Sequence, residues 1–390
     1  MTRHQPLSGV TVVDFTRILA GPMCTMLLSD LGAEVIKIER PDTGDDTRSW
    51  GPPSLGADAT YYLGVNRGKK SVALDLRDTD DLATARALID RADVVIENFR
   101  DGVMAKFGLD YDSLRHDRPE LVYCSIPAYA EGGEGKPGYD LLMQASTGMM
   151  SVTGVSEPTK VGVAILDVVT GLYAALGVVS ALSERRASGE GQRVVVGLFE
   201  ASVSALANQA AGYLLAGLLP GLSGNEHPSI VPYQLFTASD TAFVVAAGND
   251  KLYQSVTEVV GRPDLAADDR FVTNSGRVAH REELVGQLQA EFDRRTAEEW
   301  VDALEDAGVP AACVRTLDQV FMSPEGQATV MEIADERRGP LRYVRNPIMF
   351  SATPTRSSEP PPDLGQDTES ILARLTDRST DHAPIDREAP

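Results

Sequence analysis

Cysteine and positive charge are the scarce components of this 390-residue sequence. Cys24, Cys124 and Cys313 lie far apart and are odd in number, which excludes a disulfide framework and favours buried thiols in a reducing compartment. No cysteine–histidine spacing is typical of zinc, so we expect no metal site. The N-terminal MTRHQPLSGV has no apolar signal core, so nothing points to secretion, and we expect a cytoplasmic protein.

The charge balance is strongly acidic. Lys and Arg number 36 and Asp and Glu number 57, which gives a formal net charge of −21. Such a chain is a poor partner for nucleic acid or for an anionic membrane surface, and we expect neither. Any ligand that carries phosphate would need a local basic patch.

Two familiar motifs are also missing. The turn after the first predicted strand reads FTRILAGP, without the G-x-G-x-x-G of dinucleotide-binding folds, which makes an NAD-dependent dehydrogenase the least favoured enzyme. No G-x-S-x-G is present beside any of the five histidines, which argues against a hydrolase triad.

What is present is a regular alternation of strands and helices. Residues 10–15 form a β-branched run, a helix follows from Pro22 to Gly32, and 34–39 (EVIKIE) is the next strand. Strand, helix and strand within about thirty residues predict a βαβ unit and a parallel, Rossmann-like sheet. Further strands are expected at 71–76, 93–96, 121–126 and 192–198, and helices at 79–91, 102–107, 140–150 and 200–216.

A change of composition at 218–232, which is rich in Gly, Pro and Ser, predicts a domain boundary. Beyond it the pattern predicts a smaller α+β unit. Its strands are expected at 242–246 and 311–314, and its helices at 253–260, 281–294 and 297–306. The last residues are acidic and rich in Pro, which predicts a flexible tail.

The stretch at 161–182, VGVAILDVVTGLYAALGVVSAL, is apolar and contains one charge, Asp167. Its length suits a membrane span, but an acid within lipid is costly, no second such segment exists, and the flanks suit a soluble helix. We expect a helix buried on nearly all faces, from near Asp167 to about Ala187. Asp167 is then either the N-cap of this helix or a carboxylate nucleophile or base in an apolar pocket.

Other candidate groups are polar side chains in loops. In Gly138-Tyr139-Asp140, the tyrosine is either a core aromatic or faces a reactive group, and the aspartate either caps the next helix or faces that group. Cations at predicted strand ends are either solvated surface charges or, gathered at one sheet edge, a basic groove for phosphates. These cations are Arg40, Arg67, Lys69, Lys70, Arg77, Arg100, Lys106 and Lys136.

Many blocks in order and at family spacing give a resemblance that spans nearly the whole chain. The sequence resembles family III CoA-transferases, the CaiB–BaiF family, which share a superfamily with α-methylacyl-CoA racemases. The blocks are DFTRILAGPMCTMLLSDLGAEVIKIERP (14–41), NRGKKSVALDL (66–76), DVVIENFR (93–100), GYDLLMQASTG (138–148), GQRVVVGLFEA (191–201), GNEHPSIVPYQLF (224–236) and AGVPAACV (307–314).

The resemblance implies an α/β fold in which a Rossmann-like large domain holds an inserted small α+β domain, with two chains interlocked as rings in a homodimer. The implied organisation is a first part of the CoA-binding domain at 1–217, a linker and small domain at 218–315, a returning C-terminal segment at 316–375 and a tail at 376–390.

The resemblance also implies chemistry. Asp167 would be the nucleophile that moves coenzyme A from an acyl-CoA thioester to a free carboxylic acid, through an aspartyl anhydride and an aspartyl-CoA thioester. Acyl-CoA would be a substrate, with no permanently bound cofactor. The implied coenzyme A contacts are Arg17, Ile18, Leu19, Ala20, Arg40, Leu74, Arg77, Asn98, Phe99, Arg100, Lys106, Lys136 and Tyr139.

Three departures from the family pattern bear on the substrate. The small-domain region reads LSGNEHPS where formyl-CoA and oxalate enzymes have a glycine run, and Leu19 stands where they have glutamine, so oxalate is not the expected acceptor. Tyr139 stands where racemases have histidine, which removes one of two opposed acid/base groups and favours transfer. The alternatives are a racemase or epimerase that uses Asp167 and Asp140, and a non-catalytic CoA-binding protein.

Overall fold

The computed structural model describes residues 4–133, 135–353, 355 and 359–376. The chain divides into two compact units: a large one of residues 1–149, 161–217 and 329–390, and a small one of residues 150–160 and 218–328. Residues 316–328 therefore group with the small unit, whereas the sequence assigned them to the returning segment. The expected tail at 376–390 lies, beyond Thr376, outside the described residues.

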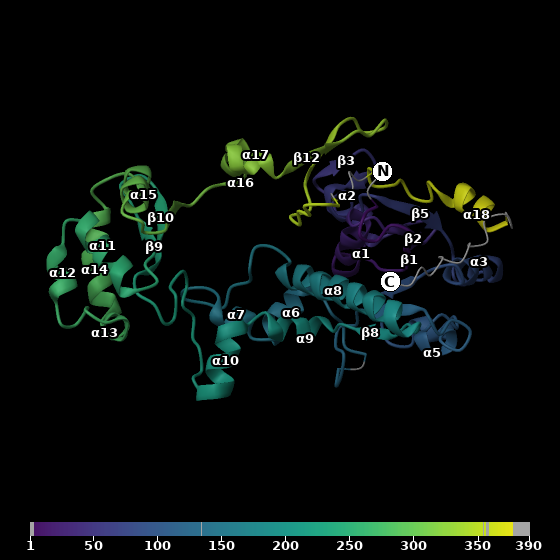
Figure 1. Cartoon of the computed structure of the whole chain (residues 1–390), viewed down its shortest axis with the longest axis horizontal. Helices are drawn as coiled ribbons and strands as arrows, with labels where there is room; N and C mark the ends of the chain where they lie inside the picture. The colour runs from purple at the N-terminus through teal and green to yellow at the C-terminus, as the bar shows by residue number, and fades with distance from the viewer. Residues whose placement is uncertain (1–3, 134, 354, 356–358, 377–390) are drawn as a thin grey trace. The chain divides into compact units, whose positions relative to one another are not determined.

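A parallel sheet is the centre of the large unit (Figure 1). Its strand order is β5-β2-β1-β6-β7-β8, and every neighbouring pair is parallel, which confirms the predicted parallel sheet. In chain order this is 3-2-1-4-5-6, the doubly wound arrangement. The strands are β1 (Thr11–Asp14), β2 (Glu34–Glu39), β5 (Lys69–Ala73), β6 (Val94–Glu97), β7 (Val122–Ser125) and β8 (Arg193–Val195).

Both faces of the sheet are covered because side chains alternate along each strand. Val12 packs with one set of helices and Val13 with the other, and both are fully buried. Each such buried aliphatic side chain contributes about 1.5–3 kcal/mol. One face carries α1 (Ala20–Asp30) and α8 (Ile165–Ser188); the other carries α3 (Thr79–Ile89), α4 (Val103–Lys106), α5 (Tyr111–Leu114) and α18 (Thr368–Thr376).

The long apolar helix α8 differs from its prediction in two respects. It begins at Ile165 after an N-cap at Ala164, so the N-cap interpretation of Asp167 is wrong. The expected burial on nearly all faces is also wrong, because Leu172 and Leu176 are 49% and 62% exposed. The helix is long and apolar enough to cross a membrane, but Ala174, Val178, Ala181 and Leu182 on its other face pack into the core of the sheet, as in a globular protein.

Two predicted helices are each divided. The expected helix at 140–150 is α6 (Asp140–Ser146) followed by α7 (Met149–Val152), with Gly148 at a φ of +91° between them. The expected helix at 200–216 is α9 (Leu198–Ser204) followed by α10 (Ala207–Ala216), interrupted where Ala207 has a φ of +43°. A positive φ takes the backbone out of the right-handed helix.

The C-terminal segment covers the edge strand β5, whose unpaired backbone groups would otherwise face solvent. The Asp367 N–H donates to the Ser71 carbonyl at 2.9 Å, and the Asp367 carboxylate accepts the Ser71 N–H at 2.9 Å. Thr368 Oγ1 accepts the Ala73 N–H at 3.0 Å. The remaining elements of the large unit are η1 (Asp46–Ser49), β3 (Ser54–Leu55), β4 (Asp58–Ala59), α2 (Thr60–Val65), β12 (Val330–Ile333) and β13 (Leu341–Val344).

The small unit has the predicted α+β composition. Its sheet is antiparallel in the order β11-β10-β9, and strand β9 (Tyr233–Thr237) had no counterpart in the sequence prediction. Phe236, Phe243, Phe292 and Trp300 form an aromatic core. The other elements are β10 (Ala242–Ala246), β11 (Ala311–Cys313), α11 (Asp250–Val259), α12 (Pro263–Ala267), α13 (Asn274–Ala279), α14 (Arg281–Phe292), α15 (Ala297–Asp306), α16 (Leu317–Met322) and α17 (Pro324–Ala328).

Candidate active site

The loops after β1 and β6 meet where the strand order reverses, the position at which open α/β sheets bind ligands. The Asn98 side chain joins the two loops. Its Oδ1 accepts the Arg17 backbone N–H at 2.9 Å, and its Nδ2 donates to the Arg17 carbonyl at 2.8 Å. One amide therefore fixes both backbone groups of Arg17 and sets the path of the first loop.

A cavity of about 150 Å³ opens at this edge of the sheet. Residues from six separate stretches of the chain line it, from the first loop to the start of α9. The sequence-predicted residues on its wall are Arg17, Ile18, Leu19, Ala20, Asn98, Phe99, Arg100, Lys136, Tyr139 and Asp167.

A second cavity adjoins the first and shares Arg17 and Phe99 with it. Its volume is about 220 Å³, and three more predicted residues, Arg40, Leu74 and Arg77, line it. Lys106 is exposed at the end of α4 and lies outside the lining of both cavities.

The predicted basic groove is smaller than the sequence indicated. Arg67, Lys69 and Lys70 line neither cavity. They precede or begin β5 and so lie at its amino end rather than its carboxyl end, and acidic side chains of the large unit pair with them. Arg67 Nη2 lies 2.7 Å from Asp30 Oδ2, and Lys69 Nζ lies 3.2 Å from Asp14 Oδ2. Lys70 Nζ lies 2.5 Å from Glu34 Oε1.

The cations that do line the cavities are themselves partly paired. Asp46 binds both Arg17 and Arg40, with N–O distances of 2.8 and 2.7 Å. Arg77 is held by Asp75 at 2.8 Å, although 83% of its side chain is exposed. Arg17 and Lys136 also lie over aromatic rings, those of Phe99 and Tyr129.

Asp167 occupies the third position of α8, on the wall of the first cavity. Burial, and secondly the charge of Asp140, raise the pKa of Asp167 from 3.8 to about 7. This pKa difference corresponds to a free-energy cost of about 4 kcal/mol for ionising the side chain. A helix N-terminus usually stabilises an ionised acid by only about 0.3–1 kcal/mol. Desolvation therefore outweighs the helix dipole here.

Asp140 does not cap the helix that begins with it, contrary to one of its two predicted roles. The N-cap of α6 is Tyr139, and Asp140 Oδ1 instead accepts the Leu166 backbone N–H in the first turn of α8 at 2.9 Å. Asp140 Oδ2 accepts from Gln144 Nε2 at 2.5 Å, and Gln144 Oε1 accepts the Val161 N–H at 2.8 Å. Two side chains of α6 thus hold the chain that leads into Asp167.

Tyr139 is not a core aromatic, because 53% of it is exposed and it lines the cavity. The sequence reasoning missed Tyr129, which lines the same cavity, carries Lys136 Nζ 5.3 Å from its ring centroid and stacks on Phe199 at 5.0 Å. Its position directly before the glycine-rich loop at 130–139 was the one available signal. Leu198, at the start of α9, was also missed.

The comparisons with known proteins agree over nearly the full length. The sequence model of CoA-transferase family III matches residues 7–368. A succinate–glutarate CoA-transferase of Agrobacterium fabrum is 39% identical over 96% of this chain and 96% of its own length. A human succinyl-CoA:glutarate CoA-transferase is 37% identical over 96% and 87%. The crystal structure of a CaiB/BaiF family protein from Brucella suis superposes with a TM-score of 0.85 at 40% identity, over 96% of this chain and all of that one.

Proposed function

This chain belongs to CoA-transferase family III and is an acyl-CoA:carboxylate CoA-transferase. From that premise we propose that Asp167 carries first the acyl group and then coenzyme A during transfer. The observation that carries the proposal is the position of Asp167. It lies on the wall of the cavity that Arg17, Asn98, Lys136 and Tyr139 also line, in an environment that raises its pKa to about 7.

The first half of the reaction transfers coenzyme A to the enzyme. A carboxylate oxygen of Asp167 attacks the thioester carbonyl, the C–S bond breaks, and a mixed anhydride and the CoA thiolate form. The thiolate then attacks the aspartyl carbonyl of the anhydride. This step releases the donor acid and leaves coenzyme A on Asp167 as a thioester.

The second half runs the same steps in reverse with the acceptor acid. Its carboxylate attacks the aspartyl thioester and expels the thiolate. The thiolate then attacks the acceptor's own carbonyl in the new anhydride, which gives the new acyl-CoA and restores Asp167. No water is consumed in either half.

The contacts of the helix start support this assignment of roles. The Ile165 and Leu166 N–H groups already donate to Val163 and to Asp140, so they are committed to fixing the helix start and are not donors to an oxyanion. Asp140 uses both of its carboxylate oxygens as acceptors within the protein. That arrangement suits a positioning group better than the second acid/base group of a racemase.

The coenzyme A molecule would extend across both cavities. Its nucleotide would lie in the second cavity beside Arg40, Leu74 and Arg77, and its pantetheine arm would pass Arg17 and Phe99 towards Asp167. Lys106, which is exposed on α4, would contact the nucleotide phosphates.

The substrate acids are proposed to be C4 and C5 dicarboxylates, because two relatives are named for transfer between succinate and glutarate. Succinyl-CoA and glutarate are therefore the first pair to test. Oxalate is not the expected acceptor, because Leu19 replaces the glutamine of the oxalate enzymes and the region around residues 221–224 lacks their glycine run.

The test is mass spectrometry of the purified protein with succinyl-CoA, before and after addition of glutarate. We expect an adduct of coenzyme A on the peptide that contains Asp167, which disappears with glutarate as glutaryl-CoA forms. Asp167→Asn should lose the adduct and lower transfer by roughly 10³-fold or more. Asp335 is a buried carboxylate outside both cavities, and Asp335→Asn should keep both the adduct and the transfer activity. An adduct on another residue, or normal turnover by Asp167→Asn, would reject the nucleophile.

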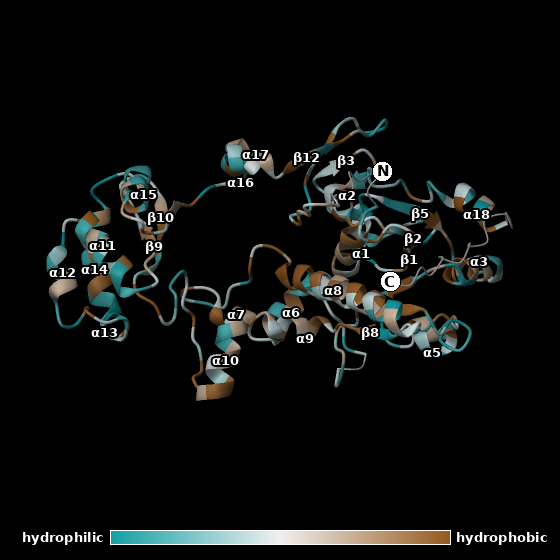
Figure 2. Cartoon of the chain, viewed as in Figure 1, coloured by the Kyte–Doolittle hydropathy of each residue, from teal (hydrophilic) through white to brown (hydrophobic). Residues whose placement is uncertain are grey.

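The assembly is proposed to be a homodimer of interlocked chains. Figure 2 shows hydrophobic residues along α8 and at the end of α10. Leu172 and Leu176 on α8, and Leu214 and Leu215 on α10, are between 49% and 87% exposed in the single chain. A second copy would bury them, and light scattering of the purified protein should give twice the chain mass. We also propose a cytoplasmic location, which the three free thiols support.

A further inference from the structure

Ile18, in the loop that begins the candidate active site, has an unusual backbone conformation. Its φ is +73°, and it and Ala207 are the non-glycine residues with positive φ among those that the structure describes. A β-branched side chain at such an angle is strained and persists only where the surroundings impose it. Ile18 lines the first cavity between Arg17 and Leu19, so this angle determines which groups of the loop face the ligand.

The Ile18 backbone N–H is bound by Asp45, which is 1% exposed. Asp45 Oδ1 accepts the Ile18 N–H at 3.2 Å and also caps η1 by accepting the Thr47 N–H at 3.0 Å. Its other carboxylate oxygen lies 3.0 Å from Lys37 Nζ, and that ammonium donates to the Thr16 carbonyl at 2.7 Å. Asp45 and Lys37 therefore hold the loop on both sides of Arg17.

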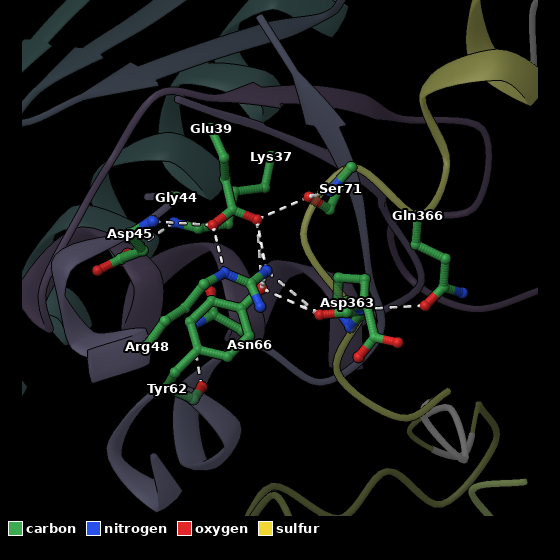
Figure 3. Close-up of polar contacts among 12 residues, drawn as sticks. Lys37, Glu39, Gly44, Asp45, Arg48, Tyr62, Asn66, Ser71, Asp363 and Gln366 are labelled. Atoms are coloured by element: carbon green, nitrogen blue, oxygen red, sulfur yellow. Dashed lines mark hydrogen bonds and ion pairs between the residues drawn. The ribbon is translucent and has the colours of Figure 1, made fainter. Parts of the chain in front are cut away.

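Asp45 is in turn held by Glu39, the centre of the polar cluster in Figure 3. Glu39 Oε2 accepts the Asp45 N–H at 2.9 Å, and the carboxylate binds Arg48 through two bonds of 2.9 and 2.7 Å. Ser71 Oγ donates to Glu39 at 2.7 Å and accepts the Gly365 N–H of the C-terminal segment at 2.9 Å. The support behind Asp45 is thus buried, charged and continuous with the edge of the sheet.

We propose that Asp45 is a positioning residue that keeps Ile18 in its left-handed conformation and so prepares the Arg17–Ala20 loop for coenzyme A. Asp45 lines the second cavity, but it is 1% exposed and its carboxylate is occupied by contacts within the protein. It acts through the Ile18 N–H, and without it the loop relaxes to an ordinary φ that coenzyme A must reverse on binding. The affinity for coenzyme A falls in consequence. This inference rests on the proposed function for the identity of the ligand only.

The test compares two Asp45 variants by calorimetry with coenzyme A and by acyl-CoA kinetics. Asp45→Ser keeps a cap for η1 but is too short to reach Ile18, and we expect about a tenfold loss of affinity, the equivalent of one good hydrogen bond. Asp45→Asn keeps an oxygen in reach of the Ile18 N–H and should recover most of that affinity. The loss should appear in the KM for acyl-CoA with little change in kcat.

A matched control is Asp335→Ala, because Asp335 is also buried, accepts backbone N–H groups at 2.8 and 3.2 Å and pairs with Arg338. It should lower the melting temperature without changing affinity for coenzyme A. If Asp45→Ser and Asp335→Ala change that affinity equally, or if Asp45→Asn is as weak as Asp45→Ser, the proposal is wrong.

The decisive variant is Ile18→Gly, because glycine adopts a φ of +73° without strain. In that background Asp45→Ser should cost about threefold or less in affinity, and the effects of the two substitutions on the melting temperature should be non-additive. Equal losses in both backgrounds would overturn the role assigned to Asp45. If the wild-type protein does not bind coenzyme A, the proposed function fails, while the coupling in melting temperature still decides whether Asp45 maintains the strained conformation of Ile18. The double variant also serves if Asp45→Ser alone does not fold.

Discussion

Asp140 Oδ1 lies 2.9 Å from the backbone nitrogen of Leu166, the residue directly before Asp167. The same carboxylate therefore fixes the first turn of α8 and, through its charge, helps burial to raise the pKa of Asp167 to about 7. Asp140 thus acts on both the position and the acidity of the proposed nucleophile, and the two effects can be separated by experiment.

The pH profile of transfer should have an acid limb near pH 7. Asp167 must be ionised to attack, and its pKa of about 7 means that it gains this form as the pH rises through 7. We expect kcat/KM for succinyl-CoA to rise tenfold for each pH unit below the limb and to level off above it. A rate that is flat from pH 5 to 8 would contradict the raised pKa.

Asp140→Asn should move that limb to lower pH, because it removes a negative charge that disfavours the ionised form of Asp167. It also places an amide opposite the Gln144 amide donor, which weakens the support of the 161–167 stretch, so kcat should fall as well. Asp112→Asn, an exposed carboxylate paired with Arg115, should leave the limb in place. The measurement is the pH profile of kcat/KM for the three proteins.

Asp167→Asn should stabilise the protein above pH 7. An acid whose pKa is 3.8 when unfolded and about 7 when folded binds more protons in the folded state between these values, so stability falls as the pH rises from about 4 to about 7. The increase in the free energy of unfolding that Asp167→Asn produces should be near zero at pH 4 and at most about 4 kcal/mol at pH 8. Thermal unfolding at both pH values checks this, and an identical gain at the two would count against a buried, protonated Asp167.

Asn98→Ala should raise the KM for acyl-CoA about tenfold or more, because both backbone groups of Arg17 lose their partner. Asn98→Asp should be no better, since a carboxylate would face the Arg17 carbonyl in place of the Nδ2 donor. Asn346→Ala, a buried amide that binds Asp30 at 3.2 Å, serves as the control. Asn346→Ala should lower the melting temperature but leave the KM for acyl-CoA unchanged. If it raises the KM as much as Asn98→Ala does, the effect of Asn98→Ala reflects a general loss of stability.

Arg48→Met should lower the free energy of unfolding of the large unit by about 3–5 kcal/mol, because it leaves the Glu39 carboxylate buried without its cation. Combining it with Glu39→Gln should recover part of the loss, since no charge then remains unpaired. The measurement is a double-mutant cycle by chemical denaturation. Additive losses would show that the two side chains of Figure 3 do not stabilise each other.

Local sequence signals predicted the elements that need no distant partner. Strand β2 is where the EVIKIE run placed it, because β-branched residues suit a buried strand. Helix α3 begins at Thr79 with Asp78 as its cap, as expected of an aspartate before an amphipathic run. The divided helices and the missed strand β9 show where tertiary contacts and single backbone angles overrode such signals.

By itself, the sequence determined the βαβ alternation and the parallel sheet, because hydrophobic periodicity and turn residues act over a few positions. Its resemblance to the family supplied most of the candidate residues at the carboxyl edge of that sheet. Only the tertiary structure decided which of those residues meet. Asp140 with Leu166 and Asp45 with Ile18 are pairs separated by 26 and 27 positions, and the burial of Lys69 against Asp14 spans 55. No local propensity encodes such pairs, since each depends on where the packed sheet and helices place two distant backbones.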